Sequence, residues 1–170
     1  MVEAVTIATL PPAARLAVRA GAVAAEALGR AYGVTLPTEP CRAAAVTRRF
    51  ALWLGPDEWL LIADGADGNA LAAELTAGLG GEPASIVEVS DRNVAIEVSG
   101  PAAADVLSAF NPLDLDETAF PVGMCTRTVF AKAEIVLWRP QTDVFRIEVW
   151  RSFAPYILGQ LDEAAREYLD

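Results

Sequence analysis

Three acidic residues within four positions, Asp114, Asp116 and Glu117, have types and spacing that could do chemistry. Two carboxylates held close together can serve as a general acid and a general base. The same residues lie between Pro112 and Pro121, in a stretch whose composition is also typical of a solvated loop. The sequence therefore leaves two interpretations open, a carboxylate pair for acid/base catalysis and a loop with no chemistry.

The chain contains no histidine. Histidine is the usual acid or base at neutral pH and the commonest metal ligand, so serine- and cysteine-type nucleophiles would lack their normal base. The two cysteines, Cys41 and Cys125, lie far apart and form no Cys-x-x-Cys pair. No glycine-rich phosphate-binding motif is present. We expect no catalytic residue and no metal site in this chain.

The charge balance excludes several classes of partner. Acidic residues outnumber basic ones by 23 to 13, which gives a formal charge of −10. Such a chain is not attracted to phosphate backbones or anionic lipid, so we expect no nucleic-acid and no membrane partner. The most apolar helical stretch, residues 16–31, is interrupted by charged residues and falls short of the ~20 apolar residues of a membrane span. With no secretory signal visible, we predict a cytoplasmic protein.

The spacing of apolar residues predicts the elements that position these side chains. Leu16, Ala20 and Leu28 recur at helical intervals, which predicts a helix over residues 13–32 that stops at Gly33. Alternating apolar and polar residues or short apolar runs predict strands at about residues 50–54, 58–63, 87–89, 94–98, 126–130, 134–138 and 144–150.

Three further helices complete the pattern. One is predicted to carry Leu71 and Leu75, and one to begin at Pro101, because proline is favoured at the first helical position. The last is predicted to follow Ser152, which we expect to cap it while Phe153 packs at its start. The mixture of strand pairs and helices predicts an α+β fold with mainly antiparallel sheets. At 170 residues the chain suits a single domain over residues 1–170.

Several short stretches carry a resemblance to a known family. They are residues 54–61 (LGPDEWLL), 87–92 (VEVSDR), 98–101 (VSGP), 111–115 (NPLDL), 120–123 (FPVG), 126–128 (TRT) and 150–153 (WRSF). In this order and spacing they resemble the sarcosine oxidase gamma subunit family of heterotetrameric sarcosine oxidase. The family-like core covers about residues 44–169.

The resemblance implies a fold similar to the folate-binding domain of aminomethyltransferases. It implies assembly with alpha, beta and delta subunits, in which FAD, FMN, NAD and tetrahydrofolate are held by the partner subunits. This chain would then be a non-catalytic gamma subunit that supports the oxidative demethylation of sarcosine to glycine. Such an enzyme belongs to sarcosine catabolism and one-carbon metabolism.

Asp114 falls nearest the position of the catalytic aspartate of the aminomethyltransferases. Residues 131–133 (AKA) stand where that family has a glycine-rich hairpin. Arg92 could hold a folate carboxylate, because arginine pairs bidentately with carboxylates. These two residues are the candidate remnant of a folate site, and the alternative for Arg92 is a turn residue or a surface ion pair.

Two tryptophans end predicted strands and point away from the apolar alternation of their neighbours. If exposed, Trp138 and Trp150 are candidates for a partner interface, as is Arg151, and simple packing under a helix is the alternative. Trp53 and Trp59 are expected in the core. Two other functions stay open, a stand-alone folate-binding one-carbon transferase and a homodimeric module.

Overall fold

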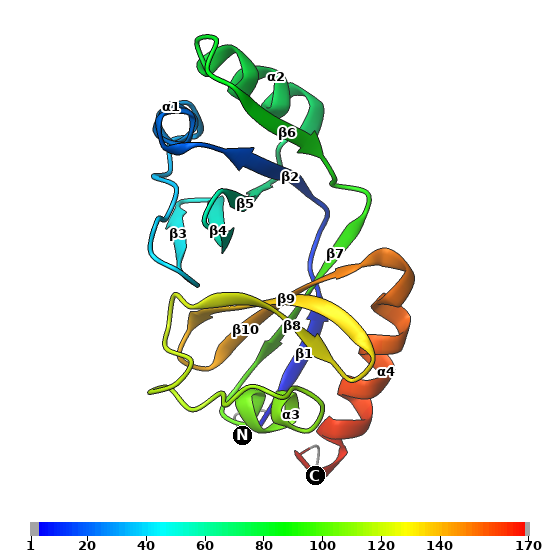
Figure 1. Cartoon of the computed structure of the whole chain (residues 1–170). Helices are drawn as coiled ribbons and strands as arrows, with labels where there is room; N and C mark the ends of the chain where they lie inside the picture. The colour runs from blue at the N-terminus through cyan, green and yellow to red at the C-terminus, as the bar shows by residue number, and fades with distance from the viewer. Residues whose placement is uncertain (1–3, 169–170) are drawn as a thin grey trace. The chain divides into compact units, whose positions relative to one another are not determined.

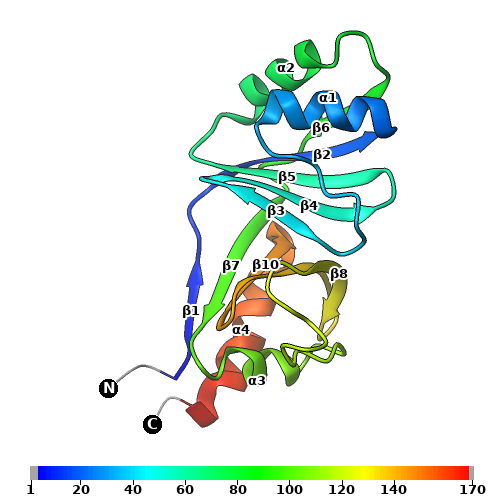
Figure 2. The ribbon, with the colours of Figure 1, turned by 90° about the vertical axis from the view of Figure 1, so that its left-hand side faces the viewer.

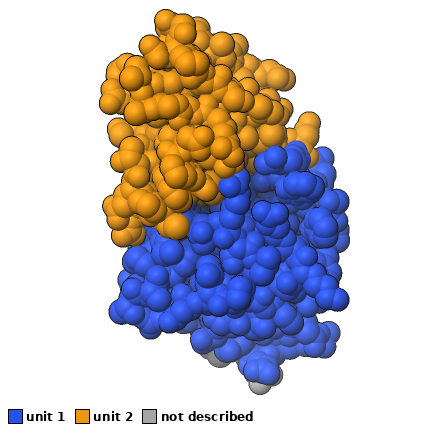
Figure 3. Space-filling view, viewed as in Figure 1, with its two compact units in different colours: residues 1–10, 92–170 blue, residues 11–91 orange. Residues whose placement is uncertain are grey.

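The computed structural model describes residues 4–168 and contains two five-stranded sheets with helices (Figure 1). The chain divides into two compact units, one of residues 1–10 and 92–170 and one of residues 11–91 (Figure 3). Each unit has its own sheet and its own hydrophobic core. All the strand pairings described are antiparallel, which confirms the predicted α+β class. That the two units fold as one domain stays a prediction.

The unit of residues 11–91 packs two helices on one face of its sheet, as Figure 2 shows for α1 and α2. The strand order is β3-β4-β5-β2-β6. Its elements are β2 (Ala13–Ala20), α1 (Ala22–Tyr32), β3 (Ala43–Val46), β4 (Arg49–Gly55), β5 (Glu58–Asp64), α2 (Gly68–Gly78) and β6 (Ala84–Glu88). Leu16, Leu28 and Leu75 are fully buried and join the sheet to the two helices.

The predicted helix over residues 13–32 is wrong in its first half, because residues 13–20 form strand β2. β2 lies between β5 and β6, and six of its eight residues are buried. A strand buried on both faces is a nearly continuous apolar run, and a helical period can also be fitted to such a run. The helix itself begins after Gly21 and ends at Gly33, whose φ of 76° is typical of a helix stop.

The second unit carries the remaining elements. They are β1 (Thr6–Thr9), β7 (Asn93–Ser99), α3 (Ala103–Ser108), β8 (Cys125–Phe130), β9 (Ala133–Gln141), β10 (Val144–Trp150), the 3-10 turn η1 (Arg151–Phe153), α4 (Ala154–Ala165) and the 3-10 turn η2 (Arg166–Tyr168). The sheet order is β1-β7-β10-β9-β8. Phe145, Ile147 and Val149 of the central strand β10 share one core with apolar residues of α3 and α4.

The start of α4 differs from the prediction. Ser152 lies inside η1, and the residue before α4 is Phe153, with no side-chain hydrogen bond capping the helix. The predicted cap by Ser152 is therefore wrong. Pro155 stands in the first turn of α4, where a missing backbone N–H leaves no helical bond broken. The short turn η1 changes the chain direction between β10 and α4.

Tyr32 makes the stability of the first-described unit sensitive to alkaline pH. Its hydroxyl is fully buried and donates to the carbonyl oxygen of Ile62 at 2.6 Å. Burial is the main cause that raises the pKa of this hydroxyl well above its usual range. In the unfolded chain it ionises near pH 10. The stability that the protonated group contributes is therefore complete below pH 10 and declines as the pH rises above it.

We expect the wild type to lose about 1.4 kcal/mol more per pH unit above pH 10 than Tyr32→Phe, because one additional proton is released on unfolding. Urea denaturation of both proteins between pH 9 and about pH 11 measures the difference. Parallel pH dependences would show that the Tyr32 hydroxyl ionises in the folded chain.

Candidate functional site

The carboxylates of the acidic stretch shape their own loop. Asp114 Oδ1 accepts a hydrogen bond from the backbone N–H of Asp116 at 3.0 Å, and both side chains are exposed. Asp116 Oδ1 accepts from the hydroxyl of Thr118 at 2.6 Å and from its backbone N–H at 2.9 Å. These hydrogen bonds hold the pKa of Asp116 below its usual range, and the bond from the Thr118 hydroxyl has the largest effect. A carboxylate that stays charged near neutral pH is a poor general acid, so the geometry favours the loop interpretation.

Arg139 fixes the position of this loop. Its guanidinium is almost fully buried and donates to the carbonyl oxygens of Leu115 at 3.1 Å and Phe120 at 2.8 Å. It also lies 4.9 Å from the centre of the Phe145 ring. The structural role of Arg139 was not predicted from the sequence, although an arginine within a buried strand is itself a signal of such a role. The loop is therefore held in place by the scaffold.

The two residues of the predicted folate-site remnant do not come together. Arg92 immediately precedes β7, whereas the loop that carries Asp114 is bonded to the far side of the sheet through Asn111 Nδ2, which donates to Val129 of β8 at 3.0 Å. β10 and β9 separate β7 from β8, which corresponds to about 14 Å at the usual strand spacing. Arg92 and Asp114 therefore lie on different parts of the sheet, and a folate site that includes both stays a prediction.

The tryptophans divide between core and surface. Trp59 is buried, as predicted, and Trp53 is half-buried. Trp138 is only 6% exposed, which removes it from the interface candidates. It lies on β9 between Cys125 of β8 and Arg146 of β10, so strands flank it on both sides. Trp150, in contrast, is 54% exposed.

Trp150 belongs to a small exposed surface at the end of β10. The Arg92 guanidinium lies 5.9 Å from the centre of the Trp150 ring, and Arg92 Nε donates to Asn93 Oδ1 at 3.1 Å. Arg151 is exposed, and its backbone N–H donates to the Arg92 carbonyl oxygen at 2.8 Å. Phe153 is 44% exposed, so the expectation that it packs at the helix start is wrong. We call Arg92, Trp150, Arg151 and Phe153 the Trp150 patch.

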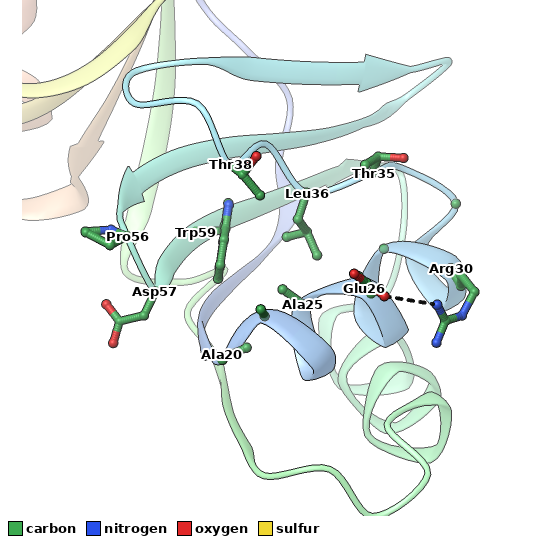
Figure 4. A pocket seen from close by; sticks show the side chains of 14 residues that line it. Ala20, Ala25, Glu26, Arg30, Thr35, Leu36, Thr38, Pro56, Asp57 and Trp59 are labelled. Atoms are coloured by element: carbon green, nitrogen blue, oxygen red, sulfur yellow. Dashed lines mark ion pairs between the residues drawn. The ribbon is translucent and has the colours of Figure 1, made fainter.

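A cavity of about 650 Å³ lies beside α1 in the unit of residues 11–91 (Figure 4). Buried Ala25, Leu36 and Trp59 line its floor, and the exposed Glu26–Arg30 pair, 4.0 Å apart, stands at its rim. Trp59 Nε1 donates to the Pro37 carbonyl oxygen at 2.7 Å, so the floor presents no polar group that needs a ligand. The floor can hold an apolar group, and the lining also includes the polar residues Thr35, Thr38 and Asp57.

This cavity was not predicted from the sequence. Its signal was the run of alanine and glycine on one side of the predicted helix, where Ala22, Ala25 and Gly29 keep side chains out of the hollow. A Cβ on Gly29 would stand 3.3 Å from the Val34 carbonyl oxygen, because the chain after α1 crosses the helix closely there. The small residues therefore leave space for the cavity and also allow the chain after α1 to pack closely on the helix.

Two kinds of feature are absent from residues 4–168. No three His, Cys, Asp or Glu side chains in that range gather where they could hold a metal ion. No helix in the described part of the chain is both long and apolar enough to cross a bilayer. The exposed Trp150 patch and the cavity beside α1 are two features that could meet another molecule.

Comparisons with known proteins agree on one family. The family described as "Sarcosine oxidase, gamma subunit family" matches residues 17–167. The sarcosine oxidase subunit gamma of an Arthrobacter species is 40% identical over 139 residues, which are 80% of this chain and 68% of the relative. A chain in the structure of heterotetrameric sarcosine oxidase from Corynebacterium sp. U-96, in complex with pyrrole 2-carboxylate, matches with a TM-score of 0.92 and 33% identity. That match covers 100% of this chain and 88% of the other.

A second structure shows the fold alone. The glycine cleavage system aminomethyltransferase T from Bartonella henselae matches with a TM-score of 0.71 at 18% identity, over 94% of this chain and 46% of the other. The predicted similarity to the aminomethyltransferase fold is confirmed. At this identity the match carries no activity over to the chain.

Proposed function

Because the chain belongs to the sarcosine oxidase gamma subunit family, we propose that it is the non-catalytic gamma subunit of a heterotetrameric sarcosine oxidase. The match to one chain of such an enzyme, with a TM-score of 0.92 over the whole of this chain at 33% identity, carries the proposal. In this role the chain supports the oxidation of sarcosine to glycine without taking part in the chemistry.

The placement of the candidate residues supports a non-catalytic role. Asp114 and Asp116 accept hydrogen bonds within their own loop, and Arg92 lies on a different part of the sheet. These placements support a chain that does not act on folate. We assign FAD, FMN, NAD and tetrahydrofolate to the partner subunits, which are the alpha, beta and delta chains.

The charge of the chain supports the remaining parts of the proposal. With a formal charge of −10, it is repelled by nucleic acid and by anionic lipid surfaces. Protein subunits are therefore the partners that we assign to this chain, and we also propose that the complex is cytoplasmic.

Affinity purification of the tagged chain from its native cells grown on sarcosine tests this proposal. We expect flavoprotein subunits in equal proportion and sarcosine-dependent production of hydrogen peroxide by the eluate. The isolated chain, purified without its partners, should produce no peroxide from sarcosine. Turnover by the isolated chain would contradict a non-catalytic role.

Recovery of the chain alone at gentle salt and good expression would contradict assembly. A tetrahydrofolate titration then separates the two other functions. Saturable binding that Asp114→Asn weakens would indicate a stand-alone one-carbon transferase. Self-association without folate binding would indicate a homodimeric module.

A further inference from the structure

The Trp150 patch combines exposed aromatic rings with arginine side chains in a strongly acidic chain. Trp150 and Phe153 are 54% and 44% exposed and stand three positions apart, at the end of β10 and in η1. Monomeric surfaces scatter such residues singly, whereas tryptophan and arginine together are enriched at the centres of protein interfaces. The patch therefore has the composition of a docking surface.

The strand register extends this surface to a neighbouring apolar residue. Val149 of β10 pairs with Ile135, and Glu134, the next residue of β9, pairs with Val129 of β8. Paired residues share a face and successive residues alternate, so Trp150, Glu134 and Val129 point to the same side of the sheet. Val129 is itself 43% exposed. One end of this sheet thus presents tryptophan and valine on the same face.

The local charge is opposite to that of the whole chain. Arg92, Arg151 and Lys132 of the β8–β9 turn are exposed cations, set against two exposed anions, Glu134 and the Asp91 that precedes Arg92. This region therefore has three cations and two anions, whereas the full sequence has 13 basic and 23 acidic residues. Attraction between such a patch and a partner is greatest where the partner presents carboxylates.

The patch is also held in a fixed form before any partner binds. Arg92 lies over the Trp150 ring while its Nε donates to Asn93 Oδ1, and Asn93 is buried directly opposite Trp150 in the β7–β10 pairing. The Arg151 N–H bond to the Arg92 carbonyl oxygen ties the start of η1 to the same point. A surface ordered in advance loses less conformational entropy when it binds.

We propose that the Trp150 patch is the docking surface for an adjacent subunit of the oxidase, at a site where that subunit presents an apolar hollow rimmed by carboxylates. This inference rests on the proposed function, because the partner is a subunit of the same complex. The indole of Trp150 enters the hollow, and Arg92 and Arg151 face the carboxylates.

Competition during assembly tests the proposal. Wild-type and variant chains with distinguishable tags are co-expressed with the other subunits, the complex is isolated through a tag on a partner, and mass spectrometry gives the ratio of the two chains. We expect Trp150→Ala to be depleted by roughly 30-fold or more, the loss typical of a central interface residue. Arg151→Glu should be depleted roughly tenfold at low salt and less at high salt, because screening weakens charge pairs.

Matched controls use the other unit. Val46→Ala removes an apolar side chain of similar exposure, 52%, and Arg30→Glu reverses a charge on an exposed arginine. Both should be incorporated at a ratio near one. Circular dichroism melting of the isolated chains checks that all four variants fold as the wild type does.

Each outcome decides between the two proposals. Normal incorporation of both Trp150→Ala and Arg151→Glu beside an incorporated wild type overturns the docking surface and leaves the subunit role intact. Failure of the wild type itself to enter the complex overturns both. A wild-type homodimer that Trp150→Ala converts to monomer, with normal entry into the complex, assigns the surface to a second copy and also overturns this inference.

Discussion

Replacing Glu148 with alanine should lower the free energy of unfolding by about 3–5 kcal/mol, the loss expected when one partner of a buried ion pair is removed. Glu148 Oε1 lies 2.9 Å from Arg146 Nε on β10, and the two side chains are 2% and 6% exposed. The residues stand two apart on a strand and so share a face. The variant would leave the Arg146 guanidinium buried without this carboxylate.

An exposed ion pair supplies the control. Glu163 and Arg166 lie 2.8 Å apart at the end of α4, with side chains 56% and 73% exposed. Glu163→Ala should cost less than about 1 kcal/mol, because solvent already screens the pair. Arg146→Met combined with Glu148→Leu should recover most of the loss, since two apolar residues of similar size remove both charges. Urea denaturation measures all three variants, and equal losses for Glu148→Ala and Glu163→Ala would contradict the argument.

The strands could be predicted where one face of the sheet differs from the other. In β10, Phe145, Ile147 and Val149 face the core that α3 and α4 complete, so the alternation marked the strand correctly. Arg146 and Glu148, which alternate with these apolar residues, are also buried. Sequence alternation shows which face is apolar, but what covers the polar face is set by contacts between distant segments.

The prediction for β2 was wrong for a related reason. A central strand needs apolar residues on both faces, and its pattern then loses the period of two that separates strands from helices. Only the neighbours β5 and β6, which follow it by many residues in the sequence, make residues 13–20 a strand.

The candidate site was predictable to the extent that it depends on local geometry. Asp114 and Asp116 bond to backbone groups two residues ahead, a contact that loop composition already favours. The two tryptophans at strand ends looked equivalent in the sequence, yet Trp138 is buried and Trp150 is exposed. Trp138 stands between the buried residues Cys125 and Arg146, whereas Trp150 is the last residue of β10. The β7–β10 register, which sets Asn93 opposite Trp150, brings Arg92 to the Trp150 ring.

Gly100 is held where no side chain fits. Its φ is 114°, a conformation that other residues rarely adopt. A Cβ there would stand 2.6 Å from the Ala4 carbonyl oxygen and 3.1 Å from Val5 Cα. That carbonyl oxygen accepts the N–H of Ala102 at 2.9 Å, and the N–H of Gly100 donates to Asp143 at 2.9 Å. The obstacle is main chain tied by hydrogen bonds, and it cannot rotate aside as a long side chain would.

Gly100→Ala should therefore destabilise the chain by about 2–5 kcal/mol, which combines backbone strain with a forced shift of the segment before β1. Gly123→Ala separates the two causes, because Gly123 has a φ of 85° and no atom within 4 Å of a Cβ position. Strain alone should cost it about 1–2 kcal/mol. Urea denaturation gives both losses, and hydrogen exchange of the β1 amides should accelerate in Gly100→Ala alone. Equal losses in the two variants would contradict the packing argument. They would show that the Ala4 segment moves aside freely and that backbone strain alone requires glycine at position 100.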